Sequence, residues 1–132
     1  MQTITNDLST TARPTISGPQ LWLRLEGLAV LLTASILYGQ TDYSWWFFFA
    51  LLLVPDVAMI GYLVNPRIGS VLYNMVHSYL FALGFAVTAY LLQWPLATAL
   101  ALIWLAHIGM DRTAGYGLKY ADAFKHTHLD RI

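Results

Sequence analysis

The sequence contains no cysteine and very little charge. Without cysteine the chain can form no disulfide, no thiolate metal ligand and no cysteine nucleophile. Lys, Arg, Asp and Glu make up 11% of its 132 residues, against roughly 25% in a typical soluble domain, and 58% of the residues are hydrophobic. Seven basic and seven acidic residues balance, so no nucleic-acid-binding surface is indicated. This composition favours a protein embedded in a lipid bilayer.

Four apolar stretches are each about as long as a membrane-spanning helix, which needs roughly 20 residues. They lie at about 21–39, 43–64, 68–92 and 95–111. Short connections between consecutive stretches are typical of antiparallel neighbours. We therefore predict an all-α integral membrane protein, an up-down-up-down four-helix bundle within residues 19–114.

The two ends of the chain are more polar than its centre. Residues 1–18 are rich in Thr, Ser and Pro and predict a flexible cytoplasmic arm. Residues 115–132 begin with Gly115-Tyr116-Gly117, which ends the last helix, and predict a cytoplasmic or interfacial tail that carries His126 and His128. The sequence does not indicate where this tail packs.

The basic residues predict the orientation of the bundle. In the expected topology all of them fall on one side of the membrane: Arg13, Arg24, Arg67, Arg112, Lys119, Lys125 and Arg131. Because Lys and Arg accumulate in cytoplasmic loops, both termini are predicted to be cytoplasmic.

Polar side chains gather in the cytoplasmic halves of the predicted helices. They are Glu26, Asp56, Asn74, His77, His107 and Asp111. Ionisable groups are costly in hydrocarbon, so several at one depth indicate a site. His107 and Asp111 are i,i+4 neighbours on one helix face, and Pro55 is expected to kink its helix beside Asp56. The outer halves offer few polar groups, so a pocket is favoured over a channel.

The leading hypothesis is metal-free acid–base chemistry on a lipophilic small molecule, of the cyclisation, isomerisation or hydration type. A carboxylic acid in a low-dielectric site can stay protonated at neutral pH and donate a proton, with histidine as the base. The candidate catalytic residues are Asp56, His77, His107, Asp111 and Glu26. The candidate substrate-binding residues are Asn74, Tyr62, Tyr73, Trp104 and Arg112.

Two other classes stay open. Imidazole and carboxylate ligands suit iron, manganese or zinc, which would make the chain a metal-dependent membrane enzyme. The Glu-x-x-His pairs of di-metal helix bundles are missing, however, so no residue is assigned as a metal ligand and the cofactor is left open. The third class is a non-enzymatic binding protein or membrane-complex subunit, whose polar cluster only holds helices together.

Several segments resemble one protein family. They include Tyr73-Asn74-Met75-Val76-His77, the run from Ile103 to Arg112, and Gly115-Tyr116-Gly117-Leu118-Lys119-Tyr120. Over residues 21–132 the chain resembles the domain-of-unknown-function 4260 family of small bacterial membrane proteins. The resemblance implies a four-helix integral membrane protein in a bacterium and brings no activity with it. We therefore expect a multi-pass protein of the bacterial inner membrane. Small-residue pairs such as Ala82/Ala86 and Ala97/Ala101 also permit a homo-oligomer.

Overall fold

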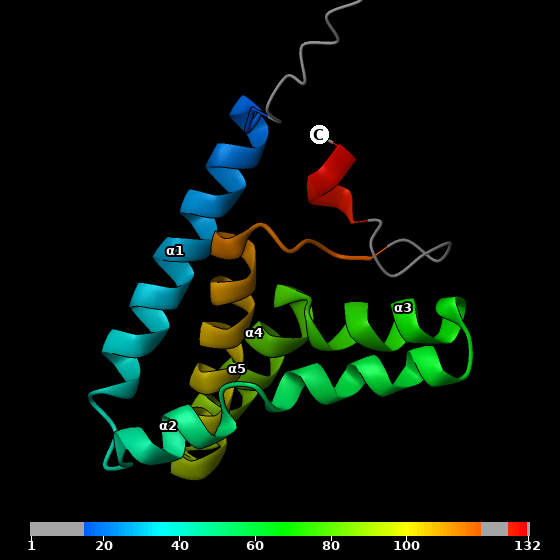
Figure 1. Cartoon of the computed structure of the whole chain (residues 1–132). Helices are drawn as coiled ribbons and strands as arrows, with labels where there is room; N and C mark the ends of the chain where they lie inside the picture. The colour runs from blue at the N-terminus through cyan, green and yellow to red at the C-terminus, as the bar shows by residue number, and fades with distance from the viewer. Residues whose placement is uncertain (1–14, 120–126, 132) are drawn as a thin grey trace, which may run out of the picture.

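The computed structural model describes residues 15–119 and 127–131, and within them the chain is helical, as predicted (Figure 1). No strand forms in this part of the chain beyond one isolated bridge between Lys119 and Thr127. The elements in order are α1 (Gly18–Tyr38), α2 (Trp45–Leu51), the 3-10 helix η1 (Val54–Leu63), α3 (Pro66–Val76), α4 (Tyr79–Leu91), α5 (Pro95–Ala114) and the 3-10 helix η2 (His128–Arg131).

Helix α5 is the central element of the fold. Both α1 and α4 pack along it, whereas η1 and α3 pair with each other. Twelve of its residues are buried, more than in any other described helix. In Figure 1 the η1–α3 hairpin runs crosswise to α1 and α5. The site residues therefore come from α5 and from the hairpin that meets it.

Two glycines allow α1 and α5 to approach each other closely. A Cβ atom added at Gly109 would lie 2.7 Å from the carbonyl oxygen of Gly27, and one added at Gly27 would lie 2.9 Å from the carbonyl oxygen of Gly109. Such close backbone contact through small residues is characteristic of membrane helices. It fixes α5, and with it His107 and Asp111, against α1.

Three helical stretches are long and apolar enough to cross a membrane: Gly18–Tyr38, Trp45–Leu63 and Pro66–Leu91. The predicted fourth span, 95–111, coincides with α5, which does not meet this measure among the described helices. The polar residues His107, Asp111 and Arg112 lower the mean hydropathy of α5. All three are buried inside the fold.

The predicted helix 43–64 is not continuous. An α-helix, α2, ends at Leu51, and the chain resumes at Val54 as the 3-10 helix η1. Pro55 has no backbone N–H to donate, and Asp56 donates its N–H to Leu53 across 3.1 Å in the tighter 3-10 pattern. The kink expected at Pro55 is thus a change of helix type that leaves the carbonyl of Leu52 without its α-helical donor.

The predicted helix 68–92 is also divided, where no break was expected. Helix α3 ends at Val76, His77 has non-helical dihedrals, and α4 begins after Ser78, whose hydroxyl accepts from the N–H of Leu80. Because of this break and the one before η1, the η1–α3 hairpin leaves the direction of α1 and α5. A bundle of four continuous antiparallel helices is therefore not confirmed.

Side chains of α5 donate to the carbonyl groups that the helix breaks leave free. The indole Nε1 of Trp104 donates to Val76 across 2.5 Å, and Arg112 Nη2 donates to His77 across 2.8 Å. His107 Nδ1 lies 2.7 Å from the carbonyl oxygen of Leu52. A freed backbone group is tolerated at membrane depth when neighbouring helices satisfy it. These contacts explain why the breaks occur where α5 can reach them.

Candidate metal centre

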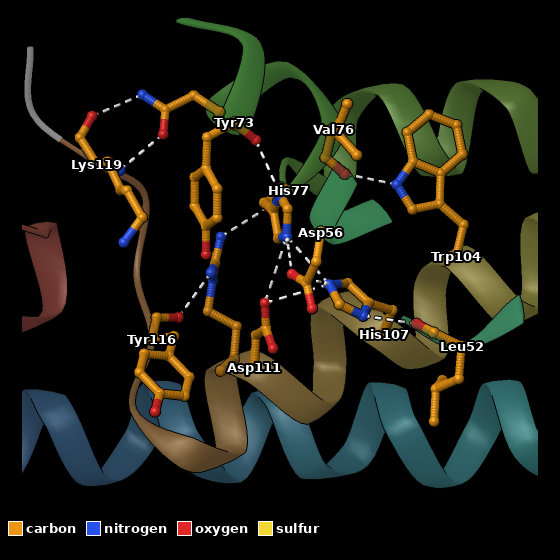
Figure 2. A network of polar contacts seen from close by, with 12 residues as sticks. Leu52, Asp56, Tyr73, Val76, His77, Trp104, His107, Asp111, Tyr116 and Lys119 are labelled. Atoms are coloured by element: carbon orange, nitrogen blue, oxygen red, sulfur yellow. Dashed lines mark hydrogen bonds and ion pairs between the residues drawn. The ribbon is translucent and has the colours of Figure 1, made fainter. Parts of the chain in front are cut away.

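Four polar side chains from three elements converge on one point (Figure 2). Asp56 comes from η1, His77 from the break after α3, and His107 and Asp111 from successive turns of α5. One ligand atom of each lies within 4.8 Å of those of the other three. They are four of the six polar residues expected at one depth, and the breaks in the helices bring these four together.

Five of the six distances between these atoms are close to those between the ligands of a tetrahedral metal ion. The two Nε2 atoms of His77 and His107 are 3.0 Å apart. Oδ1 of Asp56 lies 3.3 Å from each of these nitrogens, and Oδ2 of Asp111 lies 3.5 Å from His77 and 3.3 Å from His107. Bonds of about 2.0–2.1 Å to zinc place tetrahedral ligands about 3.3 Å apart.

The outer nitrogen of each histidine faces a backbone carbonyl. Nδ1 of His77 lies 2.9 Å from the carbonyl oxygen of Tyr73, and Nδ1 of His107 lies 2.7 Å from that of Leu52. A carbonyl oxygen only accepts, so both Nδ1 atoms carry hydrogen. In neutral rings the two Nε2 lone pairs then point at each other. This is the arrangement that orients histidine for a metal.

Burial makes this arrangement costly without a cation. The side chains of His77 and His107 are fully buried and that of Asp111 is 12% exposed, whereas Asp56 is 36% exposed. Two facing lone pairs and two carboxylates repel one another in a low-dielectric environment. A bound cation, or a shared proton, would remove that repulsion.

Part of the tail covers the His77 side of the cluster. The ring of Tyr73 stacks on the ring of His77 with centroids 3.7 Å apart, and Lys119 Nζ lies 4.6 Å from the Tyr73 centroid. Asn74 holds Lys119 by both its backbone groups, at 2.7 Å each. We call residues 115–119 the tail strap. Asn74, predicted to bind substrate, thus binds the strap.

The rest of the described tail folds back against α1. The N–H of Leu118 donates to Nδ1 of His128 across 2.7 Å, and Gln20 Nε2 donates to the carbonyl of Leu129 across 2.6 Å. His128 therefore holds the strap and takes no place in the cluster, whereas His126 lies outside the described residues.

The remaining candidate residues lie around the cluster or apart from it. Glu26 is exposed on α1 and lines a separate cavity of about 260 Å³ with Arg112 and His128. Trp104 holds the carbonyl of Val76, beside the cluster. Tyr62 packs its ring against Gly69 within the η1–α3 hairpin. Of the five candidate catalytic residues, the structure brings together all but Glu26.

Arg112, predicted to bind substrate, bridges the cluster and the tail strap. Its guanidinium donates to the carbonyl oxygens of His77 and Tyr116, at 2.8 and 2.7 Å. Arg112→Met is expected to leave both acceptors without donors and to lower the free energy of unfolding by about 2 kcal/mol. Thermal unfolding in detergent measures this. Arg67→Met, which removes an exposed arginine at the η1–α3 turn, is the control, and equal losses in both variants would contradict the bridging role.

Sequence reasoning did not find the backbone acceptors that support the cluster. These are the carbonyl groups of Leu52 and Tyr73, which fix the two imidazole rings. Any residue type can supply a free backbone carbonyl at a helix break. The sequence therefore gives no indication of these acceptors, and only the fold reveals them.

Three helical stretches long and apolar enough to cross a bilayer indicate a membrane protein, and a largely buried two-histidine, two-aspartate cluster lies within it. A family model described as "Domain of unknown function (DUF4260)" matches residues 20–132. The chain belongs to this family, as its resemblance indicated. Neither the curated proteins nor the solved structures contain a match to it.

Proposed function

We propose that this chain is an integral membrane metalloprotein that binds one divalent ion through Asp56, His77, His107 and Asp111. The observation that carries this proposal is the pair of Nε2 atoms 3.0 Å apart, each on a ring whose Nδ1 faces a carbonyl. The two Nε2 lone pairs face each other between two carboxylates, and this arrangement suits a cation. This moves the metal-dependent hypothesis ahead of the metal-free one.

The ligand set and spacing favour zinc among the first-row metals. Imidazole suits zinc, copper, iron and nickel, and mixed nitrogen–oxygen ligands at tetrahedral spacing are typical of zinc. An ion held here would act as a Lewis acid toward a substrate oxygen or a water molecule. The partial exposure of Asp56 gives the centre one side at which such a ligand could exchange.

Elemental analysis of the purified full-length protein tests the proposal. We expect about one zinc per chain, and we expect a chelator to lower the melting temperature because the ion binds only the folded state. Readdition of Zn²⁺ should restore it. A protein without bound metal, whose stability responds to neither chelator nor Zn²⁺, would contradict the proposal.

That negative outcome would favour the metal-free alternative, for which the same geometry offers a role. If one of the two histidines carried a second proton, its Nε2–H would donate to the other ring across the 3.0 Å separation. Asp56 and Asp111 would balance the resulting imidazolium, and the pair would serve as acid and base.

We further propose that both ends of the chain face the cytoplasm. The start of α1 and the end of α5 lie at one end of the molecule, and the α1–α2 and α4–α5 turns lie at the other (Figure 1). Arg24, Arg112 and Lys119 belong to the first end, which supports the positive-inside argument. The η1–α3 turn, which contains Arg67, lies to one side, so Arg67 does not contribute to this argument for the orientation.

A further inference from the structure

We infer that the substrate of the metal centre is a long-chain amphiphile that arrives from the bilayer. Its oxygen-bearing head would reach the ion beside Asp56, and its hydrocarbon chain would occupy an apolar pocket between η1, α3 and α5. This inference rests on the proposed metal centre and specifies what that centre acts on.

The tail side of the centre is closed. The Tyr73 ring covers His77, Lys119 lies over Tyr73, and Arg112 joins His77 to Tyr116 in the strap. In Figure 2 Tyr73, Tyr116 and Lys119 lie on the same side of the histidine pair. A water-soluble substrate from the tail side would have to displace the stacked ring and the strap that Asn74 holds.

The open side of the centre is apolar. Among the four ligands Asp56 has by far the largest exposed fraction, 36%. Its neighbours on η1 include exposed hydrophobic residues: Val54 is 52% exposed, Val57 65% and Ile60 62%. In a membrane such a surface contacts lipid chains, so a molecule that approaches Asp56 travels along hydrocarbon.

An apolar pocket of about 600 Å³ lies between η1, α3 and α5, and residues close in the chain to three of the four ligands line it. Pro55 and Val57, which flank Asp56, line it, as do Val76, the residue before His77, and Trp104, one turn before His107. Figure 2 shows Val76 and Trp104 on the side of the histidine pair opposite Tyr73 and Lys119. The volume falls within the 300–1,000 Å³ of ordinary ligand pockets.

The pocket selects hydrocarbon because its lining offers no free hydrogen-bonding side chain within the described residues. The only polar atom among its side chains, Nε1 of Trp104, already donates to the carbonyl of Val76. Relative to ligand dissolved in water, the affinity of this pocket should therefore grow with chain length, by about fourfold for each buried CH₂ group.

Cobalt absorption provides a direct test on the full-length protein in nanodiscs. With Co²⁺ bound, dodecanehydroxamate and acetohydroxamate present the same head group to the ion and differ in the length of their chains. We expect dodecanehydroxamate to change the visible spectrum at a concentration at least about tenfold lower than the concentration of acetohydroxamate that produces the same change. Because long chains also partition into any bilayer, a variant of the pocket has to accompany the comparison.

Ala58→Trp places an indole in the pocket, and Leu72→Trp is a second variant should the first fail to bind Co²⁺. We expect the filled pocket to remove the advantage of the long chain while acetohydroxamate acts as before. Ile36→Trp, at an exposed position on α1, is the matched control and should behave as wild type.

Each result decides between the two proposals. If Co²⁺ binds but chain length does not matter, or if the filled pocket binds dodecanehydroxamate as well as wild type does, the inference is wrong and the metal centre stands. If Co²⁺ does not bind to the wild-type protein, the metal centre itself is wrong and the inference falls with it.

Discussion

His107→Ala is expected to abolish stoichiometric metal binding, with an affinity for Zn²⁺ lowered by more than about 100-fold. Loss of a residue that only orients a ligand typically costs 10–100-fold, and His107 is proposed to be a ligand itself. Its removal also frees the carbonyl of Leu52 and leaves His77 with two carboxylates. Competition with a chromophoric chelator measures the affinity, and elemental analysis measures the stoichiometry.

Matched pairs separate the ligands from their polar neighbours. His77→Ala should behave as His107→Ala does, whereas His128→Asn should keep its metal, because the asparagine oxygen can still accept from Leu118. Asp111→Asn should weaken binding, whereas Glu26→Gln, a carboxylate outside the cluster, should not. Circular dichroism confirms that each variant is folded. Equal metal loss in Glu26→Gln and Asp111→Asn would mean that the ion is bound elsewhere.

The sequence predicted most of the cluster because the relations between its members are local. His107 and Asp111 share a face of one helix by their spacing, and Asp56 follows a proline that disturbs its helix. Each of these relations holds within a few residues. They were therefore visible before the relative positions of the helices were known.

Depth along a helix proved insufficient to predict which residues meet. Glu26 was grouped with the cluster because it lies at a similar distance from its helix end, but the direction of its side chain depends on how α1 rotates against α5. That rotation is set by the contact of Gly27 with Gly109. Asn74 likewise reaches the strap, because α3 belongs to a hairpin that runs crosswise to α5.

The break at His77 was not predictable from local sequence. Neither proline nor glycine occurs in the segment Val76-His77-Ser78-Tyr79, and apolar residues continue on both sides. The break is stabilised by donors that come from far along the chain, the indole of Trp104 and the guanidinium of Arg112. Since the same break brings His77 to the other three members of the cluster, the candidate site and the irregularity of the fold have one cause.

Gly27→Ala should be among the most destabilising single substitutions in the described chain. Its new Cβ would collide with Cβ of Arg112 and lie 2.9 Å from the backbone nitrogen of Thr113, which would force α1 and α5 apart. Overpacking usually costs about 1–3 kcal/mol, and rigid backbone atoms on the opposite helix place the expected loss at about 3 kcal/mol. Unfolding by increasing amounts of SDS in mixed micelles, followed by tryptophan fluorescence, measures it.

Gly84→Ala provides the control, because no atom lies within 4 Å of its added Cβ on the exposed face of α4. Alanine is the better helix former by about 1 kcal/mol, so this variant should be neutral or slightly stabilised. The difference between the two variants isolates the α1–α5 contact from helix propensity. If Gly27→Ala unfolds like Gly84→Ala, close packing of α1 on α5 is not what positions His107 and Asp111. If it is destabilised as expected, it should also bind Zn²⁺ more weakly, because α5 carries two of the four ligands.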